Sequence, residues 1–142
     1  MSRSSVICVD ASLVVRFLVD PDNQRVQSLW DQWFQEGRIF VAPSLIHYEV
    51  LNALFQYERH GKVSAQATSE ALAASLKIPI RLYSELELHH EALGLARRFA
   101  LPACYDAHYV ALAERLGIEL WTCDERLFKK VSGHLPWVHS AS

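Results

Sequence analysis

Val6-Ile7-Cys8-Val9-Asp10-Ala11-Ser12 is the stretch of sequence that decides the fold class. Its continuous apolar run predicts a buried strand from Val6 to Asp10. A helix is expected to follow at once, from Ser12 to Val19. A strand that passes directly into a helix is the opening half of a strand–helix–strand unit, which is the building block of a parallel sheet.

The rest of the chain repeats this alternation. Further strands are expected at 38–42, 80–83 and 119–122, with a fifth candidate at 137–139, and further helices at 20–36, 44–60, 64–76, 84–99, 106–117 and 125–131. Asp20-Pro21 is typical of an N-cap and first helical position, and Ser84-Glu85-Leu86-Glu87 of a capping box. Strands separated by helices predict an α/β fold with a central, mostly parallel sheet of four to five strands and helices on both faces. The extra helices after the first two strands are expected to form a lobe beside the sheet.

The composition is that of one folded domain, residues 1–142. Hydrophobic residues make up 51% of the chain and charged residues 21%, which excludes disorder for most of it. The apolar runs are of strand length and are broken by charges, so no membrane span is expected. The stretch Met1 to Ser5 has no long apolar segment, so we expect no signal peptide. Three cysteines without a Cys-x-x-Cys pair favour a reducing, cytoplasmic location.

The net charge is −2 and the isoelectric point is about 6.4. A protein that coats nucleic acid without sequence preference is usually basic. A nucleic-acid substrate would therefore have to be held by a local basic patch or by a bound metal, while the same charge also suits an enzyme with a small substrate.

Four acidic residues stand beside apolar segments at the places where ligands bind in parallel sheets. Asp10 closes the first strand, and Asp124 follows Leu120-Trp121-Thr122-Cys123. Glu49 lies within an apolar helix, and Asp106 opens another. The carboxyl ends of the strands in an open parallel sheet form the ligand crevice. Acids brought to this edge from separate parts of the chain predict a site that holds a cation.

The chemistry of four neighbouring carboxylates favours a hard divalent metal. Two ionised carboxylates about 4 Å apart repel by roughly 4 kcal/mol at an effective dielectric constant near 20, so they need a cation to stay ionised together. Ligand sets made only of oxygen suit Mg²⁺ or Mn²⁺, whereas zinc sites usually recruit His or Cys. Such a metal can activate a water and neutralise charge that develops on a phosphoryl group. Phosphodiester hydrolysis is the reaction that this chemistry serves best.

Each acid also has an ordinary structural interpretation. Asp124 is well placed as the N-cap of the helix at 125–131, and Asp106 could favour the positive end of its own helix. Glu49 is expected in the middle of a helix, where an acid has no capping role, although a solvated helix edge is open to it. Asp10, at the end of a core strand, is the hardest of the four to explain structurally.

Four motifs follow one another along the chain: Val9-Asp10-Ala11-Ser12, Tyr48-Glu49-Val50, Tyr105 to Ala113, and Thr122-Cys123-Asp124-Glu125-Arg126-Leu127. Together they resemble the PIN domain, in the version found in VapC-type toxins of bacterial and archaeal toxin–antitoxin pairs. Each motif is weak alone, but together they span almost the whole chain.

The resemblance implies a three-layer α/β/α fold and a ribonuclease that depends on Mg²⁺ or Mn²⁺. The metal-site acids of the family map onto Asp10, Glu49, Asp106 and Asp124, with Asp10 and Asp106 as the expected direct ligands. Ser12 and Thr122 match hydroxyl positions that would orient these carboxylates; helix-start and strand-end usage is the alternative for both. The family also implies a homodimer and an antitoxin partner that blocks the site.

Several other residues have both a functional and a structural interpretation. Arg16 is the preferred phosphate contact among the basic residues near the acids, ahead of Arg126, Lys129 and Lys130. The cysteines Cys8, Cys104 and Cys123 are expected to fill the core. His108 is expected to pack or face solvent, and His89-His90 to be exposed on a helix. The aromatic stripe Trp30, Trp33 and Phe34 is expected to face the sheet, with a groove for an antitoxin segment as the alternative.

Other functions are less consistent with the sequence. A haloacid-dehalogenase-like phosphatase would need a second acid two residues after Asp10, where this chain has Ser12. A receiver domain would bring a Lys after a late strand, where this chain has Thr122-Cys123-Asp124. A dinucleotide-binding domain would carry Gly-x-Gly-x-x-Gly, which this sequence lacks. A PIN-like scaffold that only binds RNA or protein stays open as the non-enzyme alternative.

Overall fold

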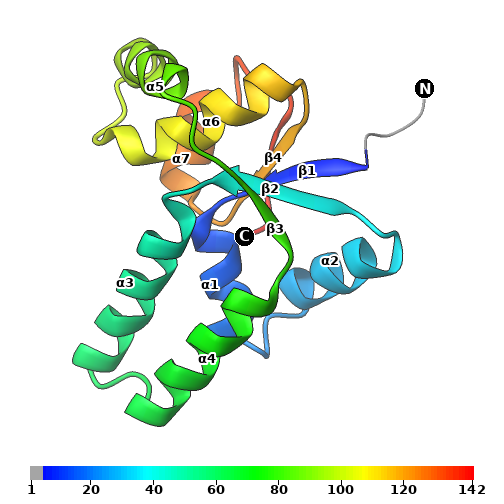
Figure 1. Cartoon of the computed structure of the whole chain (residues 1–142), viewed down its shortest axis with the longest axis vertical. Coiled ribbons are helices and arrows are strands. Elements are labelled where there is room, and N and C mark those ends of the chain that lie inside the picture. Colours follow the sequence, from blue (N-terminus) through cyan, green and yellow to red (C-terminus); the bar gives the residue numbers. More distant parts are fainter. Residues whose placement is uncertain (1–4) are drawn as a thin grey trace.

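The computed structural model describes residues 5–142, so the expectation about a leader at Met1 to Ser4 lies outside the described residues. The chain alternates strands and helices, as Figure 1 shows. The strands are β1 (Val6–Val9), β2 (Ile39–Pro43), β3 (Ile80–Tyr83), β4 (Glu119–Thr122) and β5 (Val138–Ser140). The helices are α1 (Ala11–Val19), α2 (Gln24–Gln35), α3 (Ile46–Arg59), α4 (Ala65–Lys77), α5 (Glu87–Arg98), α6 (Cys104–Leu116) and α7 (Glu125–Val131).

The five strands form one parallel sheet in the order β3-β2-β1-β4-β5. The strand β1 lies at the centre, where Ile7 is in register with Phe40 of β2 and with Glu119 of β4. Its residues Ile7, Cys8 and Val9 are fully buried because helices cover both faces of the sheet. The predicted parallel sheet is confirmed, and the fifth candidate strand is present one residue later than expected.

Helices cover the two faces of the sheet in separate layers (Figure 1). The helices α5, α6 and α7 lie on one face, and α1 to α4 lie on the other. The pair α3 and α4 packs together and against α1, which forms the expected lobe beside the sheet. The three-layer α/β/α architecture is therefore confirmed. Within residues 5–142, no helix is both long enough and apolar enough to cross a membrane.

The helix α2 packs against the sheet through its aromatic residues. Trp30 is fully buried and its ring centroid lies 5.0 Å from that of Phe40 in β2, while Trp33 lies 5.4 Å from Trp121 in β4. These two residues are core, as the first interpretation of the aromatic stripe expects. Of the stripe, only Phe34, which is 45% exposed, is available to a partner.

The N-terminal caps predicted for two helices are wrong. The helix α2 begins at Gln24 with Asn23 as its N-cap, whose side chain accepts a hydrogen bond from the backbone N–H of Val26. Asp20 instead ends α1, and Pro21 lies in the turn between the two helices. The helix α5 begins at Glu87, so Ser84-Glu85-Leu86-Glu87 is not a capping box. Short polar residues favour several caps locally, and packing of the apolar helix face decides which one is used.

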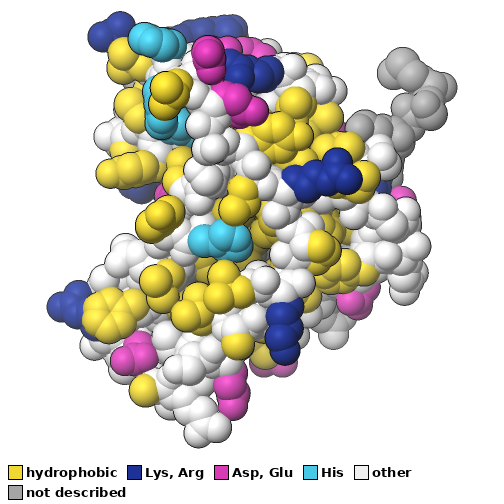
Figure 2. Space-filling view, viewed as in Figure 1, with side chains coloured by type: hydrophobic (Ala, Val, Ile, Leu, Met, Phe, Trp, Pro, Cys, Tyr) yellow, Lys and Arg dark blue, Asp and Glu magenta, His cyan; other side chains and the backbone are white. Residues whose placement is uncertain are grey.

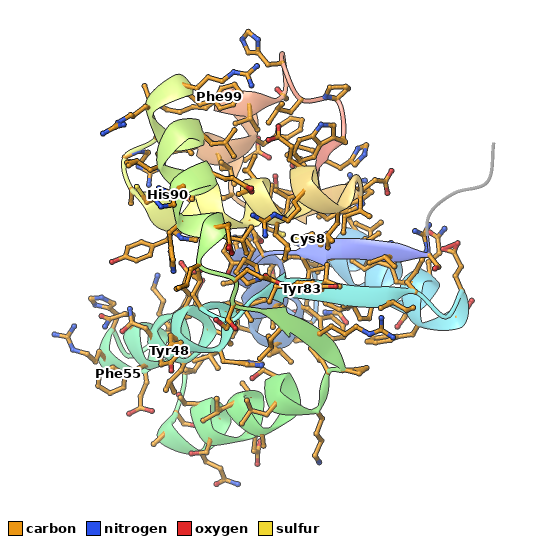
Figure 3. The ribbon with its side chains drawn as sticks, turned by 45° about the horizontal axis from the view of Figure 1, so that its top comes forward. Cys8, Tyr48, Phe55, Tyr83, His90 and Phe99 are labelled. Carbon is orange, nitrogen blue, oxygen red and sulfur yellow. The ribbon has the colours of Figure 1, made fainter. Side chains whose placement is uncertain are left out.

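The surface is hollowed between the α5–α6 layer and α3, with hydrophobic side chains on both sides of the hollow (Figure 2). The helix α3 carries three exposed apolar residues, Tyr48, Leu51 and Phe55. Figure 3 shows Tyr48 and Phe55 along this helix, with Phe55 farther from the sheet.

Candidate active site

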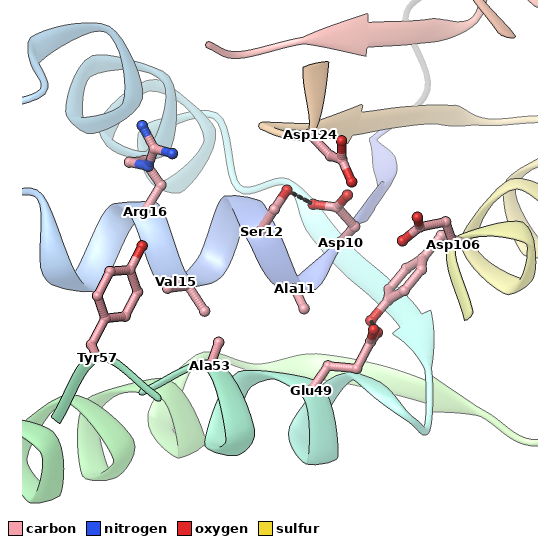
Figure 4. Close-up of a pocket in the computed structure, with 11 residues that line it drawn as sticks. Asp10, Ala11, Ser12, Val15, Arg16, Glu49, Ala53, Tyr57, Asp106 and Asp124 are labelled. Atoms are coloured by element: carbon pink, nitrogen blue, oxygen red, sulfur yellow. Dashed lines mark hydrogen bonds between the residues drawn. The ribbon is translucent and has the colours of Figure 1, made fainter. Parts of the chain in front are cut away.

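One pocket lies at the carboxyl edge of the sheet, at the point where the strand order reverses around β1. Asp10 follows β1 and Asp124 follows β4, so the sheet places them side by side. Glu49 enters from α3 on one face, and Asp106 from α6 on the other. All four predicted acids line this pocket, which has a volume of about 300 Å³ (Figure 4).

Asp10 lines the pocket and its carboxylate is held by three hydrogen bonds. It is only 3% exposed, and its Oδ1 accepts hydrogen bonds from the Ser12 hydroxyl at 2.7 Å and from the Leu13 N–H at 3.1 Å. Its Oδ2 accepts a hydrogen bond from the Thr122 hydroxyl. These contacts make Asp10 the N-cap of α1 and fix the direction of its carboxylate.

The same two hydroxyls tie together the turns that follow β1 and β4. The Ser12 Oγ accepts a hydrogen bond from the Cys123 N–H at 2.9 Å, and the Thr122 Oγ1 accepts one from the Asp124 N–H at 2.9 Å. Thr122 is fully buried. The position of Asp10 relative to Asp124 therefore depends on both hydroxyls.

Asp124 has the capping role that the structural interpretation assigns to it. Its Oδ1 accepts hydrogen bonds from the N–H groups of Arg126 at 3.0 Å and Leu127 at 3.1 Å, at the start of α7. The other oxygen, Oδ2, accepts no hydrogen bond from the described residues. Capping and site formation are thus compatible, because they use different oxygens of one carboxylate.

The prediction that Glu49 lies in the middle of its helix is wrong. Glu49 lies in the first turn of α3. The helix begins at Ile46 rather than near Ser44, because the turn after β2 takes up two more residues. The Oε1 of Glu49 accepts a hydrogen bond from the Tyr109 hydroxyl at 2.6 Å. An acid in the first turn also interacts favourably with the helix dipole.

Tyr109 is a site residue that the sequence analysis did not single out. It is 1% exposed, lines the pocket and joins α6 to α3 through Glu49. Its position three residues after Asp106 was an available signal, because residues at this spacing share one face of a helix. Burial and the nearby carboxylate raise the pKa of Tyr109, so its hydroxyl stays protonated and donates.

The prediction that Asp106 opens its helix is wrong, because α6 begins two residues earlier at Cys104. It lies half-buried in the first turn, and neither of its oxygens accepts a hydrogen bond from the described residues. Among the four acids, Asp106 is therefore the one whose two carboxylate oxygens both accept no hydrogen bond from the described residues.

Burial and repulsion between carboxylates raise the pKa values of Asp10, Glu49 and Asp106. The pKa of Asp10 is raised from 3.8 to about 7, mainly by burial and to a smaller extent by repulsion from Asp106, against the hydrogen bonds from Thr122, Ser12 and Leu13. Burial and repulsion by Asp106 also raise the pKa of Glu49, although the Tyr109 hydroxyl opposes the shift. The pKa of Asp106 is raised by burial and by Asp124, and lowered by Arg126. Asp106 thus interacts with each of the other three acids.

The donor set fits a hard cation such as Mg²⁺ or Mn²⁺. The donors are carboxylate oxygens, the negative charges repel each other, and each acid keeps an oxygen with spare acceptor capacity. Among residues 5–142, however, no three His, Cys, Asp or Glu side chains lie close enough to enclose an ion. A cation would take one or two of the acids directly and reach the others through water, which is how Mg²⁺ usually binds.

The basic residues divide between two sides of the acids. Arg16 lines the acid pocket from α1 (Figure 4). Arg126 and Lys130 line a neighbouring pocket of about 190 Å³, which shares Asp106 and Asp124 with the first. Lys129 lines neither of these pockets.

Among the described residues, no cysteine or histidine lines the acid pocket. Cys8 and Cys123 are buried as predicted, but Cys104 is exposed at the start of α6 and is not a core filler. His108 lies 2.7 Å from the carbonyl oxygen of Cys104 and 2.8 Å from His89, so it connects α6 to α5. This packing role agrees with the expectation for His108.

Comparisons with known proteins identify the family. The family model described as PIN domain matches residues 7–133. The chain is 29% identical over 126 residues to Ribonuclease VapC3 of Pyrobaculum aerophilum, with 87% of this chain and 93% of that protein covered. The crystal structure of PAE2754 from Pyrobaculum aerophilum has a TM-score of 0.71 at 27% identity, and the match covers 99% of this chain and 92% of that one.

Two further structures share the fold at lower identity. A toxin–antitoxin complex from Klebsiella pneumoniae has a TM-score of 0.66 at 16% identity, covering 96% of this chain and 98% of that one. VapC20 of Mycobacterium tuberculosis, a sarcin–ricin loop cleaving toxin, has a TM-score of 0.65 at 18% identity, covering 90% of this chain and 95% of that one. The family model spans the central strand, the four acids and the helices that carry them, so the chain belongs to the PIN domain family.

Proposed function

We propose that this protein is an endoribonuclease that hydrolyses RNA phosphodiester bonds with Mg²⁺ or Mn²⁺. The observation that carries the proposal is one pocket lined by Asp10, Glu49, Asp106 and Asp124 in a PIN domain. The relative named Ribonuclease VapC3 supports the choice of RNA as the substrate.

The four acids have different roles in binding the metal, which follow from their surroundings. Asp10 and Asp106 are the direct metal ligands, because Asp10 is fixed by three hydrogen bonds and Asp106 interacts electrostatically with all the other acids. Asp124 and Glu49 complete the site through water, with their uncommitted oxygens. The bound metal supplies a nucleophilic water and neutralises charge on the phosphate.

The neighbouring residues position these groups. The hydroxyls of Ser12 and Thr122 hold the carboxylate of Asp10, and the Tyr109 hydroxyl holds that of Glu49. Arg16 contacts a phosphate of the RNA from α1, which fixes the register of the strand without reading its bases.

We further propose that the protein is the toxin of a toxin–antitoxin pair, with a cognate antitoxin that covers the site, and that it forms a homodimer in the cytoplasm. The VapC3 relative and the fold shared with the toxin–antitoxin complex from Klebsiella pneumoniae support the antitoxin partner. A small adjacent gene for a DNA-binding protein, and co-purification of its product, would test the toxin assignment.

Cleavage of total RNA tests the enzymatic proposal. We expect fragments with Mn²⁺ and none with EDTA, and mapping of the fragment ends would reveal the sites that are cut. Asp10→Asn should abolish cleavage, whereas Asp31→Asn, which changes an exposed acid of α2 outside the pocket, should leave it unchanged. Cleavage that persists in EDTA or in Asp10→Asn would contradict the proposal, and the absence of cleavage by the wild type would favour a binding scaffold.

A further inference from the structure

Two exposed tyrosines stand directly beside two acids of the pocket. Tyr48 precedes Glu49 in α3, and Tyr105 precedes Asp106 in α6. Their exposed fractions are 78% and 64%, which is high for large aromatic side chains in a folded domain. Within residues 5–142, neither ring contacts another aromatic ring and neither hydroxyl makes a hydrogen bond. Both side chains are therefore available to a ligand.

The two tyrosines line the same groove, although they lie 57 positions apart in the sequence. The groove has a volume of about 370 Å³ and is also lined by Glu49, Asn52 and Ala53. Glu49 and Ala53 line the acid pocket as well, so the groove is continuous with that pocket. A strand of RNA with its phosphate at the acids would therefore place a neighbouring nucleotide between α3 and α6.

The chemistry of the groove suits a base rather than a phosphate. Its one ionisable carboxylate is Glu49, and the described residues that line it include no Lys or Arg, so a phosphate would be repelled. A nucleobase is uncharged and stacks on aromatic faces, which is the usual way in which unpaired RNA is held. The side-chain carbonyl of Asn52 accepts a hydrogen bond from Gln56 at 3.4 Å, which leaves the Asn52 amide N–H groups for acceptors on a base edge.

A protein partner is the competing occupant, because α3 also exposes Leu51 and Phe55. Neither Leu51 nor Phe55 lines the groove, however. Of the three exposed apolar residues of α3, only Tyr48 lines it. The alternatives can thus be separated by substituting residues of one helix.

We propose that Tyr48 and Tyr105 stack on an unpaired base that flanks the bond to be cut. This proposal rests on the proposed nuclease function, because it takes the neighbouring acid pocket as the place where RNA is cut. Paired bases are stacked inside a duplex and cannot enter the groove, so a duplex of the same sequence would bind weakly.

Binding to a fluorescent single-stranded RNA, measured by anisotropy in the Asp10→Asn background, tests the proposal. We expect Tyr48→Ala and Tyr105→Ala each to weaken binding by roughly 5- to 150-fold, the range for loss of one stacking aromatic. Tyr48→Phe and Tyr105→Phe keep the ring and should restore affinity to within about twofold of the parent, since stacking and not the hydroxyl is required. Phe55→Ala is the matched control on the same helix and should bind RNA like the parent.

Three results would overturn the stacking site. They are unchanged affinity in both alanine variants, an equal loss in the phenylalanine variants, and equal affinity for the duplex. A change in molar mass by light scattering in Tyr48→Ala, with unchanged RNA affinity, would identify a protein interface instead. Cleavage by the wild type with Mn²⁺ is measured in parallel. If cleavage is absent while the alanine variants still lose affinity, the nuclease proposal fails and the stacking site stands.

Discussion

Asp10 is the residue whose chemistry depends most on its surroundings. It is almost completely buried, and its pKa of about 7 means that a substantial fraction is protonated at neutral pH when no cation is bound. Burial disfavours the charged form, and the three hydrogen bonds it accepts compensate only in part. A residue with this pKa makes both the stability of the metal-free protein and the binding of a cation sensitive to pH.

The raised pKa of Asp10 predicts a loss of stability as the pH rises. A carboxyl group whose pKa is higher in the folded than in the unfolded protein stabilises the fold while it is protonated. This contribution is complete below pH 3.8 and is lost as the pH rises through about 7. Asp10→Asn stays neutral, so at pH 8 it should raise the free energy of unfolding of the metal-free protein by roughly 1–4 kcal/mol. Thermal unfolding in EDTA at pH 5 and pH 8 measures this, and an equal effect at both pH values would contradict it.

Thr122→Val tests whether a hydroxyl positions Asp10. Valine has nearly the same shape but donates no hydrogen bond to Asp10 and accepts none from the Asp124 N–H. We expect RNA cleavage or Mn²⁺ affinity to fall about 10- to 100-fold, as for other residues that orient metal ligands. Thr68→Val, a substitution of a similarly buried threonine in α4, is the control and should not change either quantity. Unchanged Mn²⁺ affinity and cleavage in Thr122→Val would exclude the positioning role.

At the scale of elements, the turns after β1 and β4 each use one aspartate twice. Asp10 caps α1 and Asp124 caps α7, while both line the pocket. Helices that start at the carboxyl edge of the sheet point their N-termini at the site, and their free N–H groups orient the acids. Ordinary capping and site formation are therefore two uses of the same geometry.

Substitutions of Asp124 separate its two uses. Asparagine is as good an N-cap as aspartate, so Asp124→Asn should change the free energy of unfolding by less than about 0.5 kcal/mol, whereas Asp124→Ala should lower it by about 1 kcal/mol. Both variants lose the charge, so both should lose most of the RNA cleavage. Chemical denaturation and cleavage assays on the same preparations provide the comparison. Full activity in Asp124→Asn would restrict this residue to capping.

At the scale of the whole molecule, the pocket exists because the two helical layers meet at one edge of the sheet. Glu49 comes from the α1–α4 layer and Asp106 from the α5–α7 layer, and Tyr109 connects them through a hydrogen bond. An ion bound between the layers would bind the folded protein and not the unfolded chain. Metal binding is thus coupled to global stability.

Mn²⁺ should therefore stabilise the wild-type protein against heat. At a concentration about 100-fold above the dissociation constant, the gain is about 2.7 kcal/mol. The increase in Tm should be larger at pH 8 than at pH 6, because Asp10 must lose its proton to bind the cation and its pKa is about 7. Asp106→Asn should remove most of the shift, and Asp31→Asn should retain it. Equal shifts in the wild type and in Asp106→Asn would show that Mn²⁺ binds elsewhere.

The sequence by itself determined the alternation of strands and helices, the parallel sheet and the four acids at its edge. These follow from local patterns, because apolar runs and helix stops such as Gly61 and Gly117 act over a few residues. Only the tertiary structure decided the N-cap of α2 at Asn23, the hydrogen bond between Tyr109 and Glu49, the pKa of Asp10 and the meeting of Tyr48 with Tyr105. The reason is physical: burial, repulsion and hydrogen bonds between residues far apart in the chain depend on how the layers pack, and no local pattern encodes those distances.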